Sequence, residues 1–373
     1  MEPFTNRLAV HKSCFISPRD GDMLSDVAGI RKEDGLEIEV YIGAAQGALV
    51  EINGTSAHWN GKCFATKVLL NQYRNVVTAD INGKQDTAII YWLPNAANKY
   101  SVSVDDNIWA FADLTKNADS YSSIFDNRYL NVYKQAHDQY GAKVRLNLFY
   151  EIDNPCGLEL YGPFNLSMMT ERYKEEFIAN AYWLHLAFHA KAELPNNPYS
   201  NAAAKQFREE YEMVIREIRR FAGDEVIERA TTNHWGSGSK DIVRTERDLG
   251  IDALMGYLEI DDNGNPFVSY YLSAEQVICA NEYGFWKDHE TGMVFGKIDV
   301  VLNNHDNEAV KNILEKGKRM YPKKGFIEVM IHEQYFYPTY LIYLPDYQER
   351  VLSACKWCVE HGYTPAFASE VIQ

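Results

Sequence analysis

From residue 99 to the end of the chain, short apolar segments alternate with longer segments of helical periodicity. Strands that alternate with helices pair in parallel, so seven or eight such units predict an α/β fold, a distorted (β/α)7–8 TIM-like barrel over residues 99–373. Residues from about 260 to 295 break the alternation and are predicted to form an insertion with a strand of its own at 267–272. The predicted strands are 99–105, 143–150, 182–189, 227–234, 252–258, 297–303, 325–332 and 363–367, and the predicted helices include 121–140, 170–180, 201–222, 240–249, 307–320 and 346–361.

A different pattern precedes this region. From about residue 36 to 98 the chain contains short alternating segments typical of half-buried β-strands. Asn53-Gly54 and Asn82-Gly83 between them are residues that favour tight hairpin turns. We therefore expect residues 1–98 to form an N-terminal region with a small antiparallel β-sandwich at about 36–98. This segment resembles the Ig-like modules often attached to carbohydrate-active barrels.

Composition restricts the partners and the compartment. A net charge of −15 argues against nucleic acid or an anionic membrane as a partner. The six cysteines are scattered, which indicates free thiols, and Cys355 and Cys358 lie on one predicted helix without a second pair that would complete a zinc site. The first residues do not read as a signal peptide, so we expect a cytoplasmic protein, or a secreted one if a leader is missing. The oligomeric state is left open.

Titratable side chains concentrate where the predicted strands end. Four of the ten histidines fall at these positions, and the active sites of such barrels form at the C-terminal ends of the strands. A mixture of imidazole and carboxylate suits Zn²⁺ or a similar divalent ion. The residues at or just beyond the strand ends are Asp105, Asp106, Glu151, His189, Glu193, His234, Glu259, His305, His332 and Glu333.

Three short motifs resemble the polysaccharide deacetylase family: Ser103-Val-Asp-Asp106, His185-Leu-Ala-Phe-His189 and Met330-Ile-His332. The resemblance covers roughly residues 99–373 and implies a metal-dependent hydrolase that removes acetyl groups from a carbohydrate. It implies that Asp105 is the general base, that Asp106 binds the metal, that the HxxxH motif supplies two ligands and that His332 is the general acid. The divalent metal would be Zn, with Ni, Co and Mn as alternatives.

The HxxxH motif departs from the expected geometry. If residues 182–189 form a strand, the ends of the motif are ~13 Å apart, because a strand rises about 3.3 Å per residue. His189 is then the predicted ligand and His185 a core histidine. His234 or Glu193 would complete the site, and His234 is preferred because imidazole is the commoner partner.

The family's arginine-proline motif is absent, and Asn233-His-Trp-Gly236 stands in its place. Backbone N–H groups of residues 236–238 would then have to contact the oxyanion. Trp109, Trp235 and Tyr335 are predicted to lie in loops above the barrel, where aromatic rings can stack on pyranose rings.

Two other functions are compatible with the sequence. A metal-free glycoside hydrolase would use two carboxylates on either side of the scissile bond. The third possibility is a barrel that binds carbohydrate without catalysis. The candidate carboxylates for the glycoside hydrolase are Asp105, Asp106, Glu151, Glu259 and Glu333.

Overall fold

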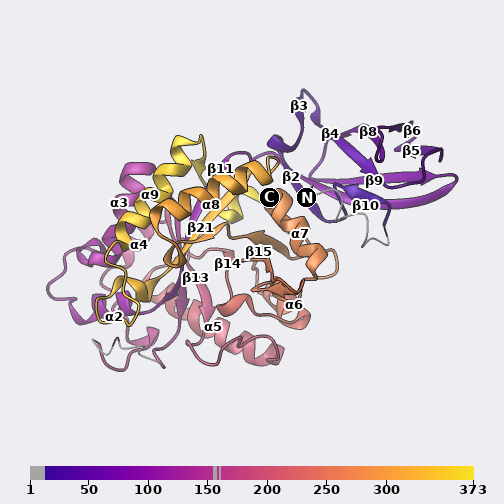
Figure 1. Cartoon of the computed structure of the whole chain (residues 1–373). Helices are drawn as coiled ribbons and strands as arrows, with labels where there is room; N and C mark the ends of the chain where they lie inside the picture. Colours follow the sequence, from indigo (N-terminus) through magenta and orange to yellow (C-terminus); the bar gives the residue numbers. More distant parts are fainter. Residues whose placement is uncertain (1–12, 154–157, 159–160) are drawn as a thin grey trace.

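The computed structural model describes residues 13–153, 158 and 161–373 and shows a mixed α/β protein. In Figure 1 the β-rich N-terminal part extends to one side of a larger part in which helices surround strands. None of the helices in the described segments is both long enough and apolar enough to cross a membrane.

The N-terminal part consists of two facing layers of antiparallel strands. One is a five-stranded sheet with the order β1 (Phe15–Ser17), β4 (Gly35–Ile42), β8 (Phe64–Leu70) and β7 (His58–Trp59), with β3 (Ile30–Lys32) also on β4. The other contains β10 (Lys84–Leu93), β9 (Arg74–Ile81), β5 (Val50–Ile52) and β6 (Thr55–Ser56). Alternate residues of β4, including Leu36, Ile38 and Val40, point into the core between the layers. The strands begin earlier than predicted, and an Ig-like topology stays a prediction.

The second layer does not stop at the N-terminal part. It continues through β2 (Asp22–Ser25), β18 (Phe285–Lys287), β19 (Val294–Lys297), β15 (Ala253–Gly256) and β14 (Ala230–Thr231) to make one nine-stranded sheet. β18 belongs to the predicted insertion and pairs with β2, so backbone hydrogen bonds join residues 13–98 to the rest of the chain. The division into domains at residue 98 stays a prediction.

A six-stranded parallel sheet carries the other strands of the predicted barrel. Its order is β13 (Leu184–Ala190), β12 (Val144–Phe149), β11 (Lys99–Asn107), β21 (Phe326–His332) and β20 (Val300–Val301), with β22 (Thr364–Pro365) on β11. The two sheets approach each other where Leu186 N donates to Val226 O at 2.8 Å and where β20 follows β19 along the chain. The parallel strands occur in the predicted order, but they form two open sheets instead of one closed barrel.

Helices cover the outer faces of the parallel strands. Side chains such as Val102, Val104 and Leu146 pack against them in the largest core, while the alternate positions of the same strands point inward. Cap residues set several boundaries: Asn127 caps α3, Ser239 caps α6 and Gly141, with φ 67°, ends α3. The helices are α2 (Trp109–Lys116), α3 (Arg128–Tyr140), α4 (Lys174–Ala179), α5 (Ala204–Phe221), α6 (Lys240–Asp248), α7 (Ala274–Tyr283), α8 (Asn307–Met320), α9 (Tyr347–Glu360) and α10 (Ala368–Val371).

Within the predicted insertion, residues 268–272 are not the expected strand. A two-stranded hairpin, β16 (Glu259–Ile260) with β17 (Pro266–Phe267), stands there and is followed by α7. The thiols of Cys355 and Cys358 are free and buried on α9, which agrees with the predicted role on a helix face.

Candidate metal centre

A cavity of about 350 Å³ opens at the C-terminal ends of the parallel strands. Asp105 and His332 lie opposite each other on the neighbouring strands β11 and β21, and His189 is near the end of β13. His234 is in a 3-10 turn (His234–Gly236) that follows β14. Ten of the residues that line the cavity are Asp105, Asp106, His189, Glu193, His234, Trp235, Asn303, His332, Gln334 and Tyr335.

A bulge at the end of β11 brings two adjacent carboxylates to the same cavity. Neighbouring residues of a regular strand point to opposite faces, but the pairing of β11 with β12 shifts register between Val104 and Asn107. Asp106 adopts the left-handed conformation, with φ 64°, at a cost of about 1–2 kcal/mol. Asn107 holds the bulge, because its Nδ2 donates to Val104 O at 2.6 Å and to Asn147 O at 3.1 Å.

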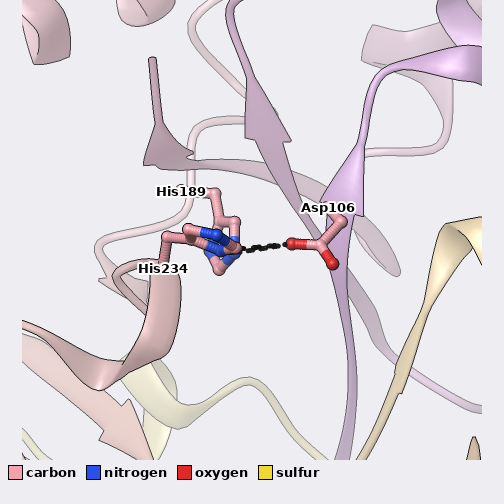
Figure 2. Close-up of side chains that lie close together, drawn as sticks. All are labelled: Asp106, His189 and His234. Atoms are coloured by element: carbon pink, nitrogen blue, oxygen red, sulfur yellow. Dashed lines mark hydrogen bonds and ion pairs between the residues drawn. The ribbon is translucent and has the colours of Figure 1, made fainter. Parts of the chain in front are cut away.

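Asp106, His189 and His234 form a compact cluster of possible metal ligands. His189 Nε2 lies 3.1 Å from Asp106 Oδ1 and 3.1 Å from His234 Nδ1, and His234 Nδ1 lies 3.4 Å from Asp106 Oδ1. All three residues are buried. Figure 2 shows the carboxylate facing the two imidazole rings. These three donor atoms could hold one ion and leave coordination positions for other ligands.

Each of the two histidines has one ring nitrogen that points away from the cluster and bonds to a backbone carbonyl. These bonds determine which nitrogen of each ring presents a lone pair to the cluster. His189 Nδ1 donates to Thr232 O at 2.5 Å, and His234 Nε2 donates to Glu193 O at 3.0 Å. Since a carbonyl oxygen can only accept, the proton of each neutral ring is on the outer nitrogen. The inner nitrogens then present lone pairs toward Asp106. Metal-binding histidines are oriented in this manner.

The cluster is therefore short of positive charge. Burial raises the pKa of Asp106, but its contacts with His189 and His234, which become hydrogen bonds when an imidazole gains a second proton, outweigh burial and hold that pKa well below its usual range. Burial lowers the pKa of His189, while the charge of Asp105 and the contact with Asp106 raise it above its ordinary value. Three acceptor atoms within a few ångströms need a cation between them, and either a proton or a metal ion supplies it.

Gln334 and Glu193 flank this cluster. Gln334 Nε2 donates to Asp106 Oδ2 at 2.7 Å and so orients the carboxylate. The carboxylate of Glu193 lines the cavity but is outside the three-residue cluster. Burial and the negative charge of Asp106 raise the pKa of Glu193 to about 7.

Asp105 lies at the end of a buried polar network. Asn147 Nδ2 donates to Asp105 Oδ1 at 2.6 Å, and Asn147 Oδ1 accepts from Arg145 Nε at 3.0 Å. Arg145 also forms a fully buried ion pair with Glu328 at 2.7 Å. Sequence reasoning missed Arg145 and Asn147. Their alternation with apolar residues in Val-Arg-Leu-Asn-Leu-Phe is the signal that could have found them.

His332 is held beside the cavity by Asn303. Its Nδ1 lies 2.8 Å from Asn303 Oδ1 and donates to it, so Nε2 is the nitrogen left for a ligand. Tyr335, the next aromatic residue along the chain, has its ring centroid 6.1 Å from that of His332.

Other predicted residues lie elsewhere or are already engaged. His185 is half-buried, pairs with Glu228 at 2.5 Å and stacks on Phe367, so it does not line the cavity. Trp109 is not in a loop: it starts α2 and is 1% exposed, because its ring packs within the core. Trp235 and Tyr335 do line the cavity.

The backbone donors expected near Gly236 are also engaged. Gly236 N donates to Asn233 O at 2.7 Å and Ser237 N to His234 O at 3.3 Å. An oxyanion contact from these two N–H groups is therefore not available in this conformation.

No protein-family model matches this chain, and no curated protein matches it. Among solved structures, a CE4 family pseudoenzyme from Bacillus anthracis is 11% identical over 76% of this chain and 67% of its own, with a TM-score of 0.36. A peptidoglycan N-acetylglucosamine deacetylase is 10% identical over 75% and 90%, with a TM-score of 0.39. A 4-alpha-glucanotransferase from Thermococcus litoralis is 10% identical over 74% and 40%, with a TM-score of 0.44. Polysaccharide deacetylases, the family that the sequence resembles, are thus among the structures similar to this chain.

Proposed function

We propose that this protein is a metal-dependent hydrolase that removes acetyl groups, from an amide or an ester, on a carbohydrate. The observation that carries the proposal is the convergence of three buried acceptor atoms, on Asp106, His189 and His234, with both histidines oriented by backbone carbonyls. This donor set fits Zn²⁺, or Ni, Co or Mn. Such an ion supplies Lewis acidity, which makes a water molecule more acidic and polarises a carbonyl group.

The chain's own residues would divide the proton transfers. Asp105, held by Asn147, would accept a proton from the attacking water. His332, with Nδ1 on Asn303, would donate a proton from Nε2 to the leaving nitrogen or oxygen. Because Asp105 and His332 are register partners on adjacent strands, both groups can reach one substrate. Trp235 and Tyr335 would contact the sugar ring.

A metal-free glycoside hydrolase has less support, because three of its candidate carboxylates have other partners. Glu151 pairs with Lys191 at 3.1 Å and Glu259 with Lys297 at 2.6 Å. Glu333 accepts the backbone N–H groups of residues 108–110 at the start of α2, so it acts as a cap. None of the three is among the residues that line the cavity.

The first test is metal content, measured by mass spectrometry after purification and reconstitution with zinc. We expect about one metal ion per chain in the wild type and in His185→Gln, which changes a histidine of the same strand outside the cavity. His189→Ala and Asp106→Ala should lose the ion, because each removes one of three protein ligands. Circular dichroism checks that all variants are folded.

Acetate release from acetylated glucosamine oligomers and from acetylated xylan then tests the reaction. Metal retained in both His189→Ala and Asp106→Ala would overturn the metal centre. Glycosidic cleavage that a chelator leaves undiminished would favour the glycoside hydrolase, and sugar binding with bound metal but without acetate release would indicate a non-catalytic protein.

A further inference from the structure

A second cavity, also of about 350 Å³, lies at the other end of the same strands. Arg229 comes just before β14 and Asp252 just before β15, whereas His234 of the metal centre follows β14. Arg247 from the end of α6 and Lys287 from β18 also line this cavity. Tyr73, from the turn that precedes β9, completes it from the N-terminal part of the chain.

The carboxylate of Asp252 positions two of the basic side chains, Arg229 and Arg247. Arg229 Nη2 lies 2.9 Å from Asp252 Oδ2, and Arg247 Nη1 forms a short contact with Asp252 Oδ1. Backbone carbonyls add to this, since Arg229 Nε donates to Gly250 O at 3.0 Å and Arg247 Nη1 to Ile251 O at 3.1 Å. A guanidinium group has five N–H donors, so each arginine is positioned while donors remain for a ligand.

Among the described residues, Lys287 forms no salt bridge with a carboxylate, although the charge of Asp252 in the same cavity acts on it. Its Nζ donates to Tyr73 Oη at 3.2 Å and lies 5.3 Å and 5.0 Å from the ring centroids of Tyr73 and Tyr91. Burial, together with the positive charge of Arg247, lowers the pKa of Lys287. In a chain with 52 acidic and 37 basic residues, three cationic side chains against the single side-chain carboxylate of Asp252 are a local excess of positive side-chain charge, and Ile372 and Gln373 also line the cavity.

We propose that this cavity binds a small phosphorylated ligand. Its phosphate would accept hydrogen bonds from Arg229, Arg247 and Lys287, since arginine forks match the geometry of phosphate oxygens. The cavity is larger than a phosphate ion, and the ring of Tyr73, which is 38% exposed, offers a surface for a sugar-sized remainder. Because the ligand would touch residues from both parts of the chain, it would bridge the turn before β9 and the α/β part.

Isothermal titration calorimetry of the full chain, in phosphate-free buffer at low salt, tests this site. The probes are inorganic phosphate, glucose 6-phosphate and glucose. We expect saturable binding of phosphate, tighter binding of glucose 6-phosphate and no binding of glucose. Lys287→Gln and Arg247→Gln should each weaken phosphate binding about tenfold or more, because each removes a charge-assisted hydrogen bond.

Lys205→Gln is the matched control, because Lys205 is an exposed lysine on α5 outside the cavity and its loss should not change the affinity. Metal content should also stay unchanged in all three variants, since the metal centre lies at the opposite ends of the strands. The absence of saturable phosphate binding would overturn the site. So would affinities that Lys287→Gln and Arg247→Gln leave unchanged, or glucose that binds as tightly as glucose 6-phosphate.

Discussion

At the scale of single residues, the geometry of the site depends on the hydrogen bonds that its polar side chains form outside the Asp106–His189–His234 cluster. His189 and His234 are near in space, yet the carbonyls of Thr232 and Glu193 determine which nitrogens point at Asp106. Asp105 and Asp106 are adjacent in sequence but have separate partners, Asn147 for the first and the histidine pair for the second. This separation is what the proposed division of roles requires, with Asp106 as a metal ligand and Asp105 in proton transfer.

We predict that Asp105→Asn retains the metal but lowers the rate of acetate release by about 10²–10⁴-fold, the usual contribution of a general base. The amide has nearly the shape of the carboxylate and its oxygen can still accept from Asn147, so the fold should be preserved. The measurement is kcat on an acetylated oligosaccharide together with metal content. Loss of metal in Asp105→Asn, or an unchanged kcat, would contradict the division of roles.

At the scale of elements, the loop that carries His234 is anchored from behind by α6. Glu246 of this helix is buried, and its Oε1 accepts from Asn233 Nδ2 at 2.6 Å, one residue before His234. Burial outweighs this hydrogen bond and raises the pKa of Glu246 to about 8. The helix is therefore connected to the loop by a carboxyl group that the fold holds in its neutral form at neutral pH.

This carboxyl group makes stability depend on pH. The pKa of Glu246 in the folded protein is above its ordinary value. The contribution of this carboxyl group to the free energy of unfolding is therefore fully present below pH 4.5 and is lost as the pH rises through about 8. Between pH 6 and pH 9 the wild type should lose about 2–3 kcal/mol of unfolding free energy from this group. Glu246→Gln, which cannot ionise, should lack that loss.

Urea unfolding at pH 6 and pH 9 measures the difference between the two proteins, and titration of all other groups cancels in the comparison. Glu209→Gln, an exposed glutamate on α5, is the control and should follow the wild type. Parallel pH dependence of Glu246→Gln and the wild type would show that Glu246 is not held neutral.

At the scale of the whole molecule, one sheet runs through both parts of the chain. β2 pairs with β10 on one side and with β18 on the other, so the N-terminal layers and the parallel strands share a ladder of backbone hydrogen bonds. The core of the N-terminal part also includes Tyr283 from α7. Each part thus buries surface that the other supplies.

We therefore predict a single cooperative unfolding transition, in which far-ultraviolet circular dichroism and tryptophan fluorescence change at the same urea concentration. Phe285→Ala, in β18 where it pairs with β2, should lower the midpoint by removing about 3–5 kcal/mol, and the transition should remain single. Two separated transitions in the wild type would mean that the two parts are independent domains.

The sequence by itself determined the order of the elements and the residue types at the strand ends, because periodicity and strand–helix alternation are local properties. It thus predicted most of the parallel strands, although the predicted strand 297–303 proved to be the end of β19 and the separate strand β20, which lie in different sheets. Within the site, it placed Asp106, His189 and His234 near a common edge. The roles of these residues stay predictions.

Only the tertiary structure decided the features that depend on contacts distant in sequence. These include the two open sheets, the junction of β2 with β18, the burial of Trp109 and the network behind Asp105. The left-handed conformation of Asp106 is another such feature. The alternation of side chains along a regular strand predicts that the adjacent residues Asp105 and Asp106 point to opposite faces. Only the register shift between β11 and β12 brings both carboxylates into one cavity. Register is set by pairing between strands, which a single strand's sequence does not contain.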